Sequence, residues 1–198
     1  MDASETLIDL IRHGQPEGGR MFRGVTDHSL SEQGWAEMRL ATAGEAGWEV
    51  VVTSPLTRCA EFAEVLADAR GLPLERLHGL REMDFGAWDG RTASDILANG
   101  PGDLSAFWAD PERAQAPEGE ALADFRERVV SAWEHLLARY AGRHVLVVGH
   151  GGAIRVTLAH VLGMPLANLF RMEVPYAGRS RVRSDDAGVR LVAHGSHE

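Results

Sequence analysis

Two short stretches of the chain share one form, an apolar run that ends in histidine followed by glycine. They cover residues 7–14 and 144–152. Short runs rich in Val, Leu and Ile indicate strands buried on both faces, as in a parallel sheet, with each histidine where the strand ends and the chain turns. Ligands bind at that edge of open α/β sheets. We therefore expect His13 and His150 to meet at the carboxyl edge of one sheet.

The rest of the chain alternates between helical and strand patterns, which predicts the fold class. Helices are expected over about residues 32–43, 55–70, 121–140 and 152–162, and further strands over 49–54, 180–183 and 188–194. Ser31 is the expected N-cap of the first helix, and Pro55 is expected in the first turn of the second. The last two strands alternate enough to form an edge hairpin. The expected fold is a three-layer α/β domain over residues 1–198, a mostly parallel sheet flanked by helices.

Residues 72–120 have a different composition, in which Gly, Pro, Trp and Asp interrupt short pieces. From Glu82 to Glu120 there are nine acidic and two basic residues, a net charge of −7. This predicts a mostly irregular lid over the sheet, at about 82–120, with short helices around 93–98 and 104–108. We expect the lid to determine specificity. Its aromatic residues are open to two interpretations, lid packing or a pocket wall: Phe85, Trp88, Phe107 and Trp108.

The basic residues of the chain restrict its chemistry, because all 20 are arginine. Schiff-base chemistry and a P-loop both need lysine, so any phosphate recognition must use guanidinium, histidine or backbone amides. The single cysteine, Cys59, excludes an internal disulfide and an all-cysteine metal cluster. The net charge of −9 argues against nucleic acid or an anionic membrane as a partner.

Features that the sequence lacks lead to the expected location and to the prediction that there is no cofactor. No apolar run reaches about 18 residues and Met1–Thr6 has no basic flank, so we expect a cytoplasmic protein. Neither a metal nor a cofactor is predicted, because seven further histidines show no paired zinc-ligand spacing. These are His28, His78, His135, His144, His160, His194 and His197. The oligomeric state is left open, a homodimer being one alternative.

Five motifs follow one another in an order that resembles a known family. They are Leu10-Ile-Arg-His-Gly14, Leu30-Ser-Glu-Gln-Gly34, Thr53-Ser-Pro-Leu-Thr-Arg58, Leu80-Arg-Glu-Met-Asp-Phe-Gly-Ala-Trp-Asp-Gly90 and Val148-Gly-His-Gly-Gly152. With them the chain resembles the histidine phosphatase superfamily, which includes the phosphoglycerate mutases and alpha-ribazole phosphatase. The motifs span most of the chain, and the resemblance implies a phosphoglycerate mutase-like fold and a phosphohistidine intermediate.

The resemblance also implies a catalytic set. His13 would be the nucleophile, and nearby guanidiniums would keep its ring neutral as attack requires. Arg12, Arg58 and His150 would hold the phosphoryl oxygens and take up the charge that develops. Glu82 would protonate the leaving oxygen and later take a proton from water, since a carboxyl group beside a phosphate dianion holds its proton more readily.

Four further residues are predicted to bind substrate. Gln15 stands where members of the family often have Glu or Asn, and its side chain can still donate to a phosphate oxygen. Members of the family usually have an arginine just before an aromatic residue in the loop that follows. Here Arg20 and Arg23 flank Phe22, so the two arginines are alternatives for this role. Amides at and after Gly151, at a helix start, would add an anion contact.

We expect a phosphomonoester hydrolase acting on a small metabolite with little charge beyond its phosphate. Alpha-ribazole 5′-phosphate is the named candidate. A phosphoglycerate mutase-type isomerase is the first alternative, opposed by the short chain and the acidic lid, because a mutase must bind a carboxylate and a second phosphate. A catalytically silent phosphate-binding protein is the second, opposed by the presence of both a nucleophile and a proton donor.

Overall fold

The structure is a computed structural model that describes residues 5–45 and 47–196. Its elements are β1 (Thr6–Arg12), α1 (Glu32–Thr42), β2 (Val50–Thr53), α2 (Thr57–Arg70), β3 (Leu74–Arg76), α3 (Ala93–Asn99), α4 (Leu104–Ala109), α5 (Leu122–Arg139), β4 (His144–Gly149), α6 (Gly151–Leu162), β5 (Arg179–Asp185) and β6 (Gly188–Ser196). No helix in these ranges is both long and apolar enough to cross a membrane. Residues 1–4, used above for location, and His197 lie outside the described residues.

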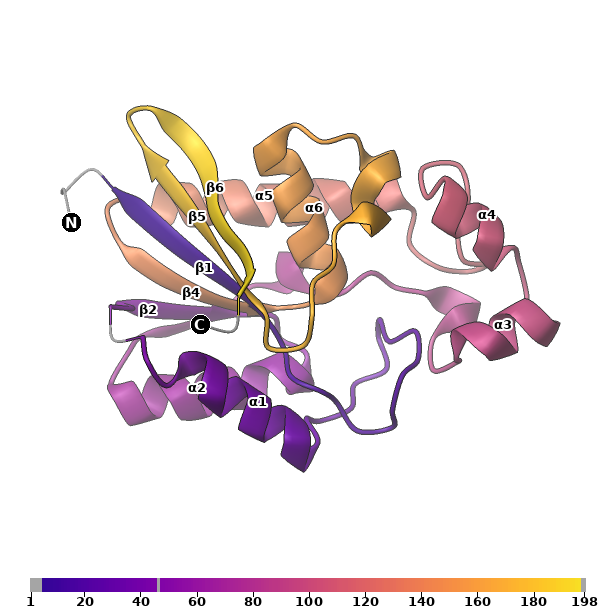
Figure 1. Ribbon diagram of the computed structural model, residues 1–198, viewed down its shortest axis with the longest axis horizontal. Coiled ribbons are helices and arrows are strands. Elements are labelled where there is room, and N and C mark those ends of the chain that lie inside the picture. Colours follow the sequence, from indigo (N-terminus) through magenta and orange to yellow (C-terminus); the bar gives the residue numbers. More distant parts are fainter. Residues whose placement is uncertain (1–4, 46, 197–198) are drawn as a thin grey trace.

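The sheet is mixed, with the order β3-β2-β4-β1-β5-β6 (Figure 1). Strands β3, β2, β4 and β1 are parallel, whereas β5 runs antiparallel to β1 and forms the predicted hairpin with β6. Strands β1 and β4 are neighbours with Arg12 opposite Gly149, and the His13 amide donates to the Gly149 carbonyl at 2.9 Å. The two His-Gly turns therefore leave the sheet side by side, as predicted.

Helices cover both faces of the sheet, α1 and α2 on one side and α5 and α6 on the other (Figure 1). Alternate residues of β1 show the division: Ile8 and Leu10 pack with Trp133 of α5, whereas Ile11 packs with Phe62 of α2. The buried pattern of β1 and β4 is continuous, as expected for strands covered on both faces. The predicted three-layer, mostly parallel α/β fold is confirmed.

Helix ends follow the predicted caps with one exception. The Ser31 hydroxyl accepts from the Gly34 amide at 3.1 Å, and Gly71 ends α2 in the left-handed conformation at φ 63°. The placement of Pro55 in the first turn of α2 was wrong, because the helix begins at Thr57. Asp27, from a distant loop, accepts from the Thr57 amide at 2.7 Å, a cap that local sequence does not reveal.

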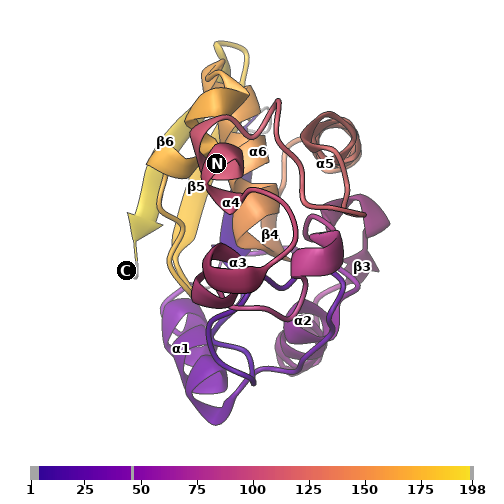
Figure 2. The ribbon, with the colours of Figure 1, turned by 90° about the vertical axis from the view of Figure 1, so that its right-hand side faces the viewer.

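The lid is better ordered than the sequence predicts. Helices α3 and α4 form where expected, and Figure 2 shows them in front of the sheet at one end of the molecule. Strand β3 (Leu74–Arg76), which precedes the lid and pairs with β2, was not predicted. Buried apolar residues of the lid pack in one cluster with α5 and α6: Met83, Trp88, Ile96, Leu104 and Phe107. The lid thus adds a third core to the two that cover the sheet.

The acidic residues of the lid serve its own architecture. Asp89 accepts hydrogen bonds from three amides of the loop at 24–26. Asp95 completes a capping box at the start of α3, and Asp103 caps α4. Glu120 forms an ion pair with Arg128 of α5 at 2.6 Å. The negative charge of the lid therefore says little about any ligand beneath it.

Candidate active site

His13 follows β1 at the carboxyl edge of the sheet and is 5% exposed. Its Nδ1 lies 2.8 Å from the carbonyl oxygen of Gly14. A carbonyl can only accept, so Nδ1 carries the hydrogen and Nε2 keeps its lone pair. The local turn thereby fixes the tautomer in which Nε2 is the nucleophilic atom.

The ring of His150 lies beside His13, with centroids 5.3 Å apart and planes at 66°. Its Nε2 is 2.7 Å from the Ser54 hydroxyl, which holds the ring at the N-cap of α6. Burial, and then the charges of Arg12 and Arg58, hold the pKa of His13 well below its usual value. Burial, and then Arg58 and His13, do the same to the pKa of His150. Both rings are neutral at pH 7, the state that nucleophilic attack requires.

Two guanidiniums flank the histidines, and each has a donor without a partner. Arg12 donates through Nη1 to the Val174 carbonyl at 2.7 Å and lies 4.0 Å above the ring of Tyr176. Arg58 is fully buried, and its terminal nitrogens donate to three carbonyls of the loop at 23–26. The Nε of both arginines is buried and has no hydrogen-bond acceptor in the described ranges. Buried donors of this kind are normally satisfied. Nε of Arg183 on β5 is a third such atom among the described residues, and the two beside the histidines fit an anionic ligand.

Glu82 reaches the same edge from the segment that leads into the lid. Its Oε2 accepts from the Gly152 amide at 2.9 Å and its Oε1 from its neighbour Met83 at 3.0 Å. A Cβ at position 152 would lie 2.2 Å from Oε1, so this approach requires glycine. The carboxylate therefore occupies the amino end of α6, where a negative charge is favoured. The Gly152 amide, one of those expected to bind phosphate, is engaged by Glu82.

The structure places the two candidate arginines differently. Arg23 is buried, donates from Nε to Nδ1 of His28 at 3.1 Å, and lines the same cleft as His13. Arg20 is exposed and lines a cavity farther out. Gln15 makes its hydrogen bonds through the main chain, including one from its amide to Glu37, and is not among the cleft-lining residues. A role of its side chain in binding stays a prediction.

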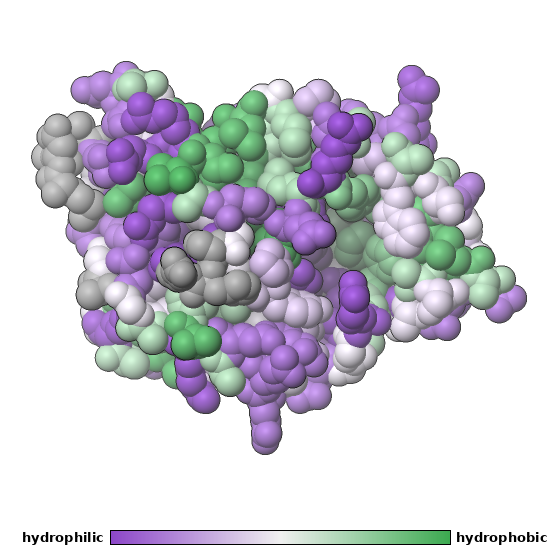
Figure 3. All heavy atoms as spheres, viewed as in Figure 1, coloured by the Kyte–Doolittle hydropathy of each residue, from purple (hydrophilic) through white to green (hydrophobic). Residues whose placement is uncertain are grey.

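The site opens into three connected spaces under the lid. The first, the reaction cleft, has a volume of about 240 Å³ and is lined by His13, Arg12, Arg23, Glu82, Gly151 and others. The second, the outer cavity, has about 330 Å³ and adds Arg20, Ala93 and Trp108. The third, the apolar pocket, is lined by Phe85, Phe107, Phe125, Leu169 and Phe170 beside Glu82. In Figure 3 a hollow separates the lid from the rest of the molecule, with apolar residues on its lid side.

Tyr176 and Arg155 are among the cleft residues that were not predicted from the sequence. Tyr176 supports Arg12, and its ring centroid is 5.8 Å from that of His13. The loop that carries Tyr176 leads into β5, the antiparallel neighbour of β1, and this topology brings Tyr176 to the site. No local sequence pattern predicts that position. Arg155 borders all three spaces. The sequence held a signal for Arg155. Apart from a histidine, it is the single residue with an acidic or basic side chain in α6, which is mostly apolar.

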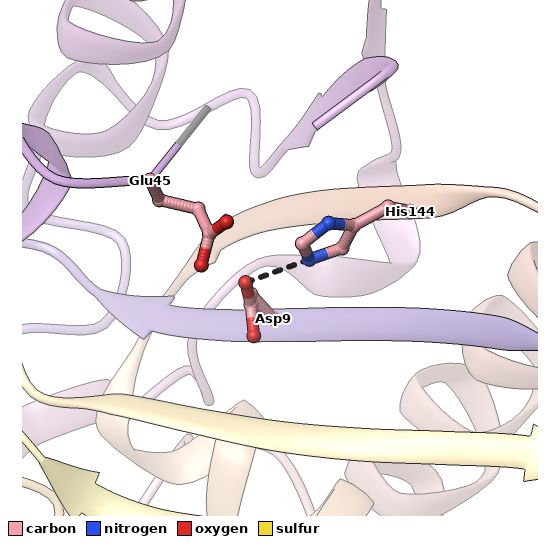
Figure 4. Close-up of side chains that lie close together, drawn as sticks. All are labelled: Asp9, Glu45 and His144. Carbon is pink, nitrogen blue, oxygen red and sulfur yellow. Dashed lines mark hydrogen bonds and ion pairs between the residues drawn. The ribbon is translucent and has the colours of Figure 1, made fainter. Parts of the chain in front are cut away.

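A second polar cluster lies inside the sheet, away from the lid. Ligand-capable atoms of Asp9, Glu45 and His144 lie within 4.8 Å of one another (Figure 4). Arg181 donates to Asp9 at 2.7 Å and to Glu45 at 2.6 Å, and Trp48 donates to Asp9 at 2.8 Å. Arg179 lies 3.5 Å from Glu45, so two arginines face the two carboxylates and the donor set fits an internal ion-pair network better than a metal.

Two curated proteins are similar to this chain in sequence. The bifunctional protein Rv2228c of Mycobacterium tuberculosis is 32% identical over 180 residues, 88% of this chain and 49% of that protein. The chain thus spans about half the length of this relative. The 2,3-bisphosphoglycerate-dependent phosphoglycerate mutase of Methylobacterium radiotolerans is 33% identical over 182 residues, 86% of this chain and 84% of that protein.

Solved structures give the same fold. The mycobacterial glucosyl-3-phosphoglycerate phosphatase Rv2419c has a TM-score of 0.83 at 28% identity, covering 96% of this chain and 98% of that one. A putative alpha-ribazole-5′-P phosphatase of Escherichia coli has a TM-score of 0.85 at 24% identity, covering 97% of each chain, which is a likeness of fold alone. The sequence profile for branch 1 of one family matches residues 8–197, nearly the whole described chain. By that match the chain belongs to the histidine phosphatase superfamily.

Proposed function

We propose that the protein is a phosphomonoester hydrolase that works through a phosphohistidine at His13. The observation that carries the proposal is the ring of His13, whose Nδ1 faces the Gly14 carbonyl and leaves Nε2 available, beside two guanidiniums that each have a buried, unpartnered Nε. A nucleophile and preorganised cations are the two requirements of phosphoryl transfer in a site without a lysine.

In the first step Nε2 of His13 attacks phosphorus, the bond to the ester oxygen breaks, and Glu82 gives its proton to the departing alkoxide. Arg12, Arg58 and His150 face the phosphoryl oxygens and stabilise the charge on them. In the second step water attacks the phosphohistidine, Glu82 takes the proton of the water, and His13 is released neutral. Two backbone amides fix the position of Glu82 beside the reaction cleft, where it can reach the ester oxygen in the first step and the water in the second.

The substrate is proposed to be a small phosphate ester, with no nucleic acid or membrane involved and a cytoplasmic location. Hydrolysis is preferred to mutase action because the outer cavity opens the cleft toward solvent, from which water can reach a phosphohistidine. The sequence favoured alpha-ribazole 5′-phosphate as the substrate, and only a likeness of fold supports that ester. A relative named as a phosphoglycerate mutase keeps the isomerase as the second candidate.

The test is phosphate release from 3-phosphoglycerate, alpha-ribazole 5′-phosphate and p-nitrophenyl phosphate, combined with quenching to trap labelled phosphohistidine. We expect release from at least one ester and an acid-labile phosphoenzyme. His13→Ala should lose turnover by at least about 10⁴-fold with an unchanged melting temperature, because the nucleophile is removed and little packing is lost. His160→Ala, at an exposed position of α6, is the matched control and should leave turnover unchanged.

Other results would reassign the protein. A phosphoenzyme that interconverts glycerate phosphates without net release indicates the mutase. Absence of any phosphoenzyme indicates a binding protein, and turnover near that of the wild type in His13→Ala excludes His13 as the nucleophile.

A further inference from the structure

Arg155 is a cleft cation that the proposed mechanism does not use. It lies on α6, five residues after His150, and burial lowers the pKa of its guanidinium. Its Nε donates to the Met172 carbonyl at 2.8 Å. Within the described ranges its terminal nitrogens make neither a hydrogen bond nor an ion pair, although Glu82 and Glu173 are near enough to act on its charge.

This arrangement is that of a binding group rather than a structural one. A guanidinium withdrawn from water loses solvation that an ion pair normally restores. The bond to Met172 holds the side chain by one nitrogen, so the two terminal nitrogens are presented as a fixed fork. Such a fork matches a carboxylate or a phosphate in two parallel hydrogen bonds.

The position of Arg155 points to a group other than the transferred phosphoryl. Arg155 borders the outer cavity and the apolar pocket as well as the reaction cleft, whereas His13 borders the reaction cleft alone. A Cβ placed on Gly151 would lie 3.3 Å from Nη1 of Arg155 and 3.4 Å from Nε of Arg12. The two guanidiniums therefore lie close together at the start of α6. Arg155 therefore adjoins the phosphoryl site on the side where the alcohol part of the ester must leave.

The lid does not oppose an anion at this place. The lid residues that line the outer cavity and the apolar pocket are mostly apolar or aromatic, and Glu82 is the one lid carboxylate among the residues that line either of them or the reaction cleft. At the mouth of the outer cavity stands a second cation, Arg20. The expectation of a substrate with little charge beyond its phosphate rested on acidic residues that point elsewhere.

We propose that Arg155 is a specificity-determining residue that binds a carboxylate on the alcohol part of the substrate, so that the preferred esters are phosphorylated hydroxy acids. The proposal rests on the proposed hydrolase function. Two bonds to the fork would orient the short carbon chain between the aromatic wall of the lid and Glu82, with the ester oxygen toward the proton donor.

The test uses esters that differ in the carboxylate alone. One pair is 3-phosphoglycerate and glycerol 3-phosphate, and another is O-phosphoserine and phosphoethanolamine. The wild type should prefer the carboxylate member of each pair by about 10- to 100-fold in kcat/KM, the range for a charge-assisted pair of hydrogen bonds. Arg155→Gln should abolish that preference while changing kcat/KM for the other member by less than about threefold.

Two further variants separate specificity from general effects. Arg155→Lys, which keeps the charge and loses the fork, should retain a reduced preference. Arg126→Gln, at an exposed position of α5, removes one positive charge outside the site and should change neither member. An equal loss on both members with Arg155→Gln would assign the residue to the phosphoryl group and overturn the proposal, as would an unchanged preference.

A binding measurement keeps this proposal separate from the hydrolase. In the His13→Ala background, calorimetric titration should show tighter binding of 3-phosphoglycerate than of glycerol 3-phosphate, and Arg155→Gln should remove the difference. That outcome supports the carboxylate site even if the wild type releases no phosphate from any ester. Equal binding of the two esters by His13→Ala contradicts it even if hydrolysis is established.

Discussion

The cluster around Asp9 and the cluster around His13 are built on the same strand, and both concentrate charge inside the protein. Around Asp9 the charges are matched, because Arg181 binds both Asp9 and Glu45 and Arg179 lies 3.5 Å from Glu45. Trp48 and His144 complete the shell of Asp9, and Figure 4 shows His144 beside it. Around His13 the charges are not matched, because Arg12 and Arg155 make no ion pair in the described ranges and Arg58 reaches its nearest carboxylate, Asp27, only at 3.9 Å.

The difference separates a structural cluster from a functional one. A satisfied network needs nothing more and stabilises the strands that it joins. A set of buried cations held by carbonyls and aromatic faces lowers the stability of the free protein and is completed by an anion. Buried charged residues therefore have a structural role in the Asp9 cluster and a functional role in the His13 cluster. The two clusters differ in whether each charge has an oppositely charged partner, and burial does not distinguish them.

Asp9→Ala tests the structural side of this comparison and should have the largest effect on stability. The change leaves Arg181, His144 and Trp48 without their shared acceptor, so the free energy of unfolding should fall by about 3–5 kcal/mol. Hydrogen bonds from Arg181, His144 and Trp48 outweigh burial and hold the pKa of Asp9 far below its usual range, so the charged form is the one lost. Urea unfolding at pH 7 measures the change.

The activity of folded Asp9→Ala should match that of the wild type, because this cluster does not touch the cleft. Asp68→Ala, an exposed carboxylate of α2, is the control and should change stability by less than about 0.5 kcal/mol. A large loss of kcat/KM in Asp9→Ala at temperatures where it is folded would break the division between the two clusters.

Glu82→Gln tests the functional side. Glutamine cannot donate a proton as an acid does, so hydrolysis of alkyl esters should slow by about 10²-fold or more, whereas p-nitrophenyl phosphate should lose much less because its leaving group needs little protonation. Steady-state kcat on both esters measures the difference. Glu112→Gln, an exposed lid carboxylate, should change neither rate. An equal loss on the two esters would remove Glu82 from the acid role.

Sequence patterns predicted most of the fold because the signals were local. The buried strands and the cap at Ser31 depend on neighbouring residues. Strand β3 was missed because three residues, Leu74–Arg76, are too few for periodicity to register. The start of α2 was misplaced because its cap, Asp27, comes from another loop.

The site was predicted less completely, and for a related reason. His13, His150, Arg12 and Arg58 adjoin strand ends or a helix start, so the sheet topology alone gathers them. Tyr176 and Arg155 reach the cleft through tertiary packing. The lid charge is weak evidence about the substrate, because composition does not tell which acidic side chains form caps and ion pairs.

The smallest expected effect is a change of stability with pH that arises from the cluster around His13. His13 and His150 have lowered pKa values in the folded protein and regain the ordinary histidine value near 6.5 on unfolding. Between the folded and unfolded values the unfolded chain binds more protons, so the stability from these rings is fully present above pH 6.5 and is lost as the pH falls. Each neutral ring should account for about 1 kcal/mol of loss between pH 7 and pH 5.5.

Urea unfolding of the wild type and of His13→Ala across this interval isolates the contribution of one ring. The wild type should lose about 1 kcal/mol more than the variant, because most carboxylates titrate below this range and affect both proteins alike. If the two proteins lose the same amount, the pKa of His13 is not lowered by folding. The cations around it would then be balanced in some other way, and both the nucleophile and the contrast with the Asp9 cluster would lose their physical basis.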